Sequence, residues 1–104
     1  MVELSFKDIG LLASIGRNPS FGYDELANEV DLSEASVRHK IYMFREHGMV
    51  VEALSDYKDM GYKWMITGKG VKEVKKNLDK TFKGFNICNL LENLENSMVV
   101  YRPK

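Results

Sequence analysis

The segment from residue 36 to residue 43 contains side chains of the types that contact nucleic acids. An arginine can bridge a base edge or a phosphate, and histidine and tyrosine can donate hydrogen bonds to either. A serine near a helix N-terminus can contact phosphate. The candidate contact residues of this segment are Ser36, Arg38, His39, Lys40, Tyr42 and Met43. Each of them is equally compatible with the solvated surface of an ordinary helix.

Lysines elsewhere in the chain add two candidate contacts with phosphate. Lys58 and Lys63 lie in or beside a predicted connection between two strands. Asp56 and Asp59 belong to the same connection, and their negative charges would repel phosphate. We therefore expect contact there to be weak. The lysine run over residues 69–83 is more typical of a solvated helix face than of a binding stripe.

No arrangement of residues in the sequence is typical of an enzyme, a metal site or a cofactor site. His39 and His47 have no cysteine or carboxylate nearby at the spacing of metal ligands. Gly68-Lys69-Gly70 lacks the spacing and the following hydroxyl residue of a phosphate loop. Cys88 is the only cysteine, which excludes an internal disulfide, and its place near an apolar stripe predicts a packed thiol. We expect no cofactor and no catalysis.

The composition is that of one small folded domain, or of a small domain with an appended helix. The 104 residues are 44% apolar and 29% charged. No apolar stretch is long enough for a membrane span, and the first residues lack the basic region of a signal peptide, so we expect a cytoplasmic protein. The net charge is zero, yet residues 1–31 carry −4 and residues 67–84 carry +4. A dipolar chain of this kind can hold a polyanion on one face.

Two helices are expected before the candidate contact residues. Ser5 and Asp8 form a capping-box pattern ahead of an apolar run, which predicts a helix over residues 5–16. Pro19 prevents its continuation. Residues 23–30 predict a short second helix, whose acidic residues lie at the start, where the helix dipole favours them.

The candidate contact residues belong to a predicted third helix over residues 33–47. Ser33 is a good N-cap, and Gly48 is the expected stop. Val37, Ile41 and Phe44 fall within about 60° of arc around this helix. We expect this side to be buried and the candidate contacts to project from the opposite side.

Two strands and two further helices are expected after the third helix. Residues 49–54 and 62–66 read as strands joined by a polar turn, and the large aromatic side chains should enter the core. The aromatic residues expected in the core are Phe44, Tyr62, Trp64 and Phe82. Residues 67–82 and 86–98 predict helices separated by a break at Gly84, and residues 99–104 a short tail.

Three motifs in this order resemble those of winged-helix DNA-binding domains, over roughly residues 5–82. The stretch Tyr23-Asp24-Glu25-Leu26-Ala27 is similar to the second helix of that family. Residues 32–50 resemble its recognition helix and the Gly48-Met49-Val50 entry into the wing. Ile66-Thr67, followed by Gly70 and Val74, is similar to the start of its last helix.

The resemblance implies an α+β, mainly helical fold: a winged helix-turn-helix, with a three-helix core and a β-hairpin wing, followed by a C-terminal helical extension. The winged-helix domain would cover residues 1–83 and the extension residues 84–104. The implied function is sequence-specific binding of duplex DNA by a transcriptional regulator. The third helix would enter the major groove, and the wing with Lys58 and Lys63 would lie on the backbone.

The extension carries an apolar stripe that must be buried somewhere. The stripe consists of Ile87, Leu90, Leu91, Leu94 and Met98. Winged-helix regulators with this layout use the last helix for dimerisation, so we expect a homodimer, with an intramolecular cap as the alternative. The rival function is a winged-helix protein–protein interaction module in a larger assembly. Three features would favour it: the neutral net charge, the acidic residues of the wing, and the exposure of Tyr42 and Met43. No feature of the sequence identifies a small-molecule effector or a target sequence.

Overall fold

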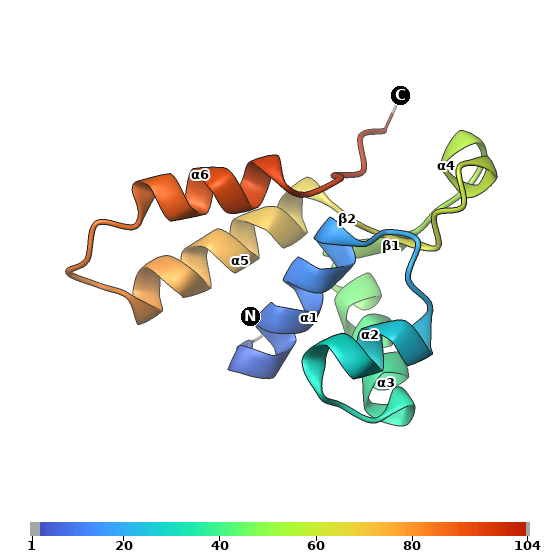
Figure 1. Ribbon diagram of the computed structural model, residues 1–104, viewed down its shortest axis with the longest axis horizontal. Coiled ribbons are helices and arrows are strands. Elements are labelled where there is room, and N and C mark those ends of the chain that lie inside the picture. Colours follow the sequence, from blue (N-terminus) through green and yellow to red (C-terminus); the bar gives the residue numbers. More distant parts are fainter. Residues whose placement is uncertain (1–2, 104) are drawn as a thin grey trace.

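The computed structural model describes residues 3–103. The described part is α+β and mainly helical, with six helices and a two-stranded antiparallel sheet (Figure 1). The elements in chain order are α1 (Phe6–Arg17), α2 (Tyr23–Val30), α3 (Glu34–Glu46), β1 (Val50–Glu52), α4 (Asp56–Asp59), β2 (Trp64–Ile66), α5 (Gly68–Thr81) and α6 (Cys88–Asn96). α1 packs on α5 and β2, α3 packs on β1, and α2 packs on α1 and α3, while α6 runs back alongside α5 (Figure 1).

The predicted starts of the first three helices are confirmed. The Ser5 hydroxyl accepts a hydrogen bond from the Asp8 backbone N–H, and the Asp8 carboxylate accepts one from the Ser5 backbone N–H. At α2 the Glu25 carboxylate accepts a hydrogen bond from the Gly22 N–H. The Ser33 hydroxyl caps α3 by accepting from the N–H of residue 36. Each cap satisfies a backbone donor that the helix itself leaves unpaired.

The two strands are shorter than the sequence predicts. They pair Val50 with Ile66 and Glu52 with Trp64, and the connection between them contains the single helical turn α4. Gly48, at φ +73°, turns the chain from α3 into β1, a conformation that favours glycine. Because α4 occupies much of the connection, only three residues of each strand pair.

The core is built around Phe44, which is fully buried, as the apolar stripe of the third helix predicts. Tyr62 and Trp64 are only partly buried. Phe82 is 39% exposed and Cys88 is exposed, so the expectation that both would be packed is wrong. Both residues belong to the end of the α5–α6 pair that projects beyond the first three helices (Figure 1). No other element reaches that end to cover them.

The segment after α6 returns to the sheet. The Val99 N–H donates to the Gly16 carbonyl, and the Tyr101 N–H donates to the Ile66 carbonyl, each at 2.8 Å. Val100 forms a parallel bridge with Ile66. The short tail that the sequence predicts therefore packs back on the domain: Val99 bonds to the end of α1, and Val100 and Tyr101 bond to β2.

Met98 is buried in its own chain, although the sequence analysis places it in the dimerisation stripe. It packs on Gly16, where a Cβ atom would lie 2.9 Å from the Met98 Cγ. The thioether thus fills a space that only a glycine leaves open. We therefore remove Met98 from the set of residues available to a partner.

Candidate nucleic-acid interface

Helix α3 presents two opposite faces. Val37, Ile41 and Phe44 are at most 1% exposed and anchor the helix in the core. Arg38, His39 and Tyr42 are exposed on the other side. This arrangement follows from the 3.6-residue period of the helix, and the predicted assignment of the buried side is confirmed.

Arg38 takes part in a stack that joins three elements. Its Cζ atom lies 4.7 Å from the centroid of the Tyr23 ring, at the first residue of α2. The Tyr23 ring lies 6.2 Å from the ring of Trp64 in β2, at an interplanar angle of 38°. The guanidinium is therefore held over an aromatic ring that is itself backed by the sheet.

Arg45 belongs to the same face and was missed in the sequence analysis. Its Cζ atom lies 5.6 Å from the centroid of the Tyr42 ring. The spacing of Arg38, Tyr42 and Arg45 at i, i+4 and i+7 was the available signal, because such residues share one side of a helix. A hollow of about 170 Å³ lies beside them, and its lining is Tyr23, Arg38, Ile41, Tyr42, Arg45 and Trp64.

Lys40 points away from this face. Its ammonium lies 2.5 Å from the Oδ1 atom of Asp8 in α1, and both side chains are largely buried. Burial by itself raises the pKa of Asp8, but the hydrogen bonds from Lys40 and from the Ser5 backbone and hydroxyl outweigh it, so the pKa is lowered from its usual value. Lys40 is thus engaged in holding two helices together.

Ser36 and Met43 lie on the flank of α3 between its two faces. Both are partly buried, and Met43 packs against the core. Arg38, His39 and Tyr42 are therefore the predicted contact residues of this segment that are most accessible. Together with Arg45 we call them the contact face of α3.

The predicted lysines of the β1–β2 connection are both exposed. Lys58 lies in α4 between Asp56 and Asp59 in the sequence. The Lys63 ammonium lies beside Gly22 at the start of α2, where the Asp24 carboxylate also lies. Carboxylates therefore accompany both lysines: Asp56 and Asp59 of the connection, as the sequence analysis expects, and Asp24 of α2, which it does not.

Aromatic contacts hold the β1–β2 connection against the returning tail. The Tyr57 ring of α4 stacks on Tyr62 at 6.3 Å and also contacts Tyr101 at 5.9 Å. Tyr57 and Tyr101 of this cluster belong to segments that are distant in the sequence. Tyr101 thereby joins the connection to the segment that follows α6.

A second surface, apolar in character, lies between α1, α5 and α6. We call it the trough; its volume is about 320 Å³ and its lining is Phe6, Ile9, Gly10, Ala13, Arg17, Val74, Leu78, Leu90 and Leu94. Phe6 is 70% exposed and Leu90 is 54% exposed at its margins. A monomer therefore leaves a continuous apolar surface open to water here.

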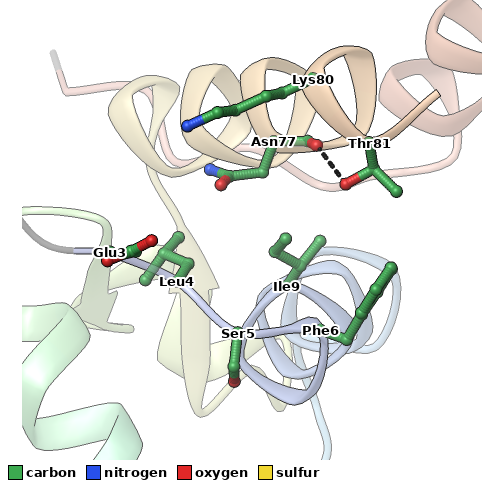
Figure 2. Close-up of a pocket in the computed structure, with 8 residues that line it drawn as sticks. All are labelled: Glu3, Leu4, Ser5, Phe6, Ile9, Asn77, Lys80 and Thr81. Atoms are coloured by element: carbon green, nitrogen blue, oxygen red, sulfur yellow. Dashed lines mark hydrogen bonds between the residues drawn. The ribbon is translucent and has the colours of Figure 1, made fainter. Parts of the chain in front are cut away.

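The trough is continued by a more polar hollow between the start of α1 and the end of α5. This hollow has a volume of about 330 Å³ and shares Phe6 and Ile9 with the trough. Figure 2 shows Leu4 and Ile9 pointing toward α5 and Ser5 pointing away from it. On the α5 side the Thr81 hydroxyl donates to the Asn77 carbonyl at 2.8 Å. The apolar and polar hollows together follow α1 along the second half of α5.

Some of the predicted dimerisation residues are partly buried within their own chain, and one is exposed to solvent. Ile87, Leu91 and Leu94 are partly buried, whereas Leu90 is mostly exposed. An ion pair of 2.8 Å between Lys75 and Glu95 holds α6 alongside α5. The stripe is therefore partly covered by its own domain and partly open at the trough.

Within residues 3–103 no group of histidine, cysteine and acidic side chains is arranged to hold a metal ion. Over the same residues no helix is both long and apolar enough to cross a membrane. No family model, no curated protein and no solved structure matches this chain.

Proposed function

We propose that this protein is a winged-helix DNA-binding protein without catalytic activity, a transcriptional regulator that inserts α3 into the major groove of duplex DNA. The observation that carries the proposal is the contact face of α3. Its exposed arginines, histidine and tyrosine are the side chains that contact base edges and phosphates. The opposite face is fully buried, so the helix is rigidly presented. We place its activity in the cytoplasm, the compartment that the sequence analysis expects.

In this proposal the wing consists of β1, β2 and the connection between them. Lys58 and Lys63 would lie near the DNA backbone. Because Asp56, Asp59 and Asp24 lie close to them in sequence or space, their net attraction for phosphate is small. We therefore assign most of the binding free energy to α3.

We further propose that the protein acts as a homodimer, with the trough of each copy covered by the other. The trough is apolar and lined by residues of three helices, with Phe6 and Leu90 exposed at its margins. The chain has no net charge, so two copies do not repel one another strongly. A dimer would also present two α3 helices to successive turns of one duplex, which multiplies the phosphate contacts.

A gel-shift series with mixed genomic duplex DNA at low and moderate salt tests the proposal. A DNA-binding protein shifts the duplex at low salt and loses affinity steeply as salt increases, because bound phosphates release counterions. A folded triple variant, Arg38→Ala with His39→Ala and Tyr42→Ala, should lose most of the shift. Full affinity in this variant would mean that another surface binds the DNA.

The second candidate function is a protein–protein interaction module. The exposed apolar margin of the trough and the carboxylates of the β1–β2 connection favour it, since neither feature attracts DNA. The same gel-shift series separates the two functions. An absence of retention at low salt would favour the interaction module and contradict DNA binding.

A further inference from the structure

The Arg38 side chain is restrained before any ligand arrives. Arginine is long and flexible, and a contact with a base normally requires its many rotamers to be reduced to one. Here the guanidinium lies 4.7 Å from the centroid of the Tyr23 ring. A guanidinium over a ring keeps its N–H donors at its edges, where they can still reach a partner.

Tyr23 is in turn restrained by the sheet. Trp64 packs against its ring at 6.2 Å, and the Trp64 backbone is paired with Glu52 of β1. The Trp64 N–H also donates to the Pro19 carbonyl at 3.3 Å. Trp64, Tyr23 and Arg38 therefore form one stack that runs from β2 through α2 to the exposed side of α3.

The second arginine–tyrosine pair of α3 is built differently. Tyr42 is 57% exposed and lies on the same helix as Arg45, with 5.6 Å between the Arg45 Cζ atom and the ring centroid. No neighbouring aromatic ring among the described residues backs Tyr42. Arg38 is therefore the arginine of the contact face whose orientation is fixed by the fold.

We propose that Tyr23 is a positioning residue that orients Arg38, and that the pair makes the protein select a guanine in its DNA site. A fixed guanidinium edge matches the O6 and N7 acceptors of guanine, which arginine contacts with two hydrogen bonds. The proposal rests on the proposed function, because it concerns the same face of α3. It adds a base preference and a residue of α2 that does not itself touch the DNA.

The test begins with selection of bound sequences from a random duplex library by the full chain. In a selected duplex, each guanine is then replaced in turn by 7-deazaguanine, which lacks the N7 acceptor, and by adenine. One position should show a loss of affinity of about 5- to 150-fold on replacement by adenine. The loss should be absent in Arg38→Ala. A smaller loss should appear at the same position with 7-deazaguanine.

The role of Tyr23 is isolated by two variants of similar size. Tyr23→Phe keeps the ring and should keep the preference for guanine. Tyr23→Leu removes the ring and should reduce the preference by about 3- to 10-fold, the effect of restoring freedom to one long side chain. Binding to unselected duplex should be unchanged in both variants, because Arg38 retains its charge.

An NMR measurement without DNA provides an independent readout. The Arg38 Hε proton should be shifted upfield by the ring current in the natural protein and in Tyr23→Phe, and should lose that shift in Tyr23→Leu. If folded Tyr23→Leu keeps both the shift and the preference for guanine, the inference is wrong while DNA binding stands. Equal weakening on every duplex also contradicts it, because positioning acts at one base. If the natural protein binds no duplex DNA, both the proposed function and this inference are wrong.

Discussion

The ammonium of Lys40 lies 2.5 Å from the Oδ1 atom of Asp8, and this ion pair joins the middle of α3 to the first turn of α1. The same carboxylate accepts the backbone N–H of Ser5. One aspartate therefore completes a helix cap and fixes the position of a second helix. The charge of Lys40 therefore has a structural role, whereas Arg38 and Arg45 carry their charges on the exposed side of the same helix.

The stability of the protein should fall in acid partly through Asp8. The folded state lowers the pKa of Asp8, so its stabilisation is fully present above the ordinary aspartate pKa and is lost as the pH falls through the lowered value. Urea unfolding at about pH 7 and about pH 3 should show a smaller difference in Asp8→Asn than in the natural protein. Asp31→Asn is the control, since the Asp31 carboxylate is exposed and lies 4.0 Å from the Lys7 ammonium. An unaltered pH profile in Asp8→Asn would contradict this account.

Gly70 should tolerate no side chain. A Cβ atom there would lie 2.6 Å from the Cγ1 atom of Ile66 and would clash with the Met49 carbonyl oxygen. Gly70→Ala should therefore destabilise the protein by about 1–3 kcal/mol, as overpacking does. Gly68→Ala, two residues earlier, meets nothing within 4 Å and should be neutral or slightly stabilising, because alanine favours the helix. Equal denaturation midpoints for the two variants would refute the close packing of α5 on the sheet.

Local patterns predicted the helices well because local interactions decide them. The cap at Ser5 and the stripe of Val37, Ile41 and Phe44 depend on neighbours a few residues away, and both are confirmed. The exposed positions of Arg38 and Tyr42 follow from the same helical period. Three residues of the contact face, Arg38, His39 and Tyr42, could therefore be predicted without the structure, whereas Arg45 was missed although the same period includes it.

The failures concern contacts between residues that are distant in the sequence. The sequence alone favours a DNA contact for Lys40, because it shows a cation on α3 and does not show that Asp8 lies beside it. Met98 continues an apolar helical stripe in the sequence, yet the chain turns after α6 and buries it against Gly16. Tyr23 carries no local sign that it lies beneath Arg38. Periodicity within one element cannot reveal its neighbours from another.

Leu90→Glu should shift the protein from dimer to monomer if the trough is the dimer interface. The substitution places a charge at the margin of the trough without touching the core, since Leu90 is 54% exposed. Phe85→Glu is a matched control, because Phe85 is 73% exposed but does not line the trough. Light scattering at several concentrations measures both. If the natural protein stayed monomeric at high concentration, the dimer hypothesis would be wrong and the trough would not be an interface between two copies.

Arg38→Ala should weaken binding to a selected duplex by about 1–3 kcal/mol and relax the base preference at one position. A phosphate contact alone would instead weaken all duplexes equally and reduce the salt slope by about one. Lys75→Ala with Lys76→Ala tests the rival basic surface on α5, and we expect little change in affinity. Unfolding curves should show that Arg38→Ala loses at most about 1 kcal/mol of stability, the contribution of an exposed contact with the Tyr23 ring. If the double lysine variant lost more affinity than Arg38→Ala, α5 and not α3 would be the main DNA-binding surface.

Met98→Ala should destabilise the protein by at least about 2 kcal/mol, the cost of removing a buried methionine side chain. Met98 is 9% exposed and fills the space beside Gly16. Leu90→Ala, at a mostly exposed position of the preceding helix, should change stability far less. Thermal unfolding compares the two. Equal midpoints would show that the segment after α6 is dispensable for the core and can be treated as a separate extension.

The return of residues 98–101 to the sheet also dictates when the molecule can finish folding during its synthesis. α1 is synthesised well before the segment that follows α6, yet its Gly16 carbonyl accepts a hydrogen bond from the N–H of Val99. Met98 and Val100 likewise reach Gly16 and Ile66 long after those residues have been made. Contacts of such high sequence separation form late. A chain that lacks residues 98–101 would leave the Gly16 carbonyl and the Ile66 carbonyl without these partners, and the core beside Gly16 would stay open.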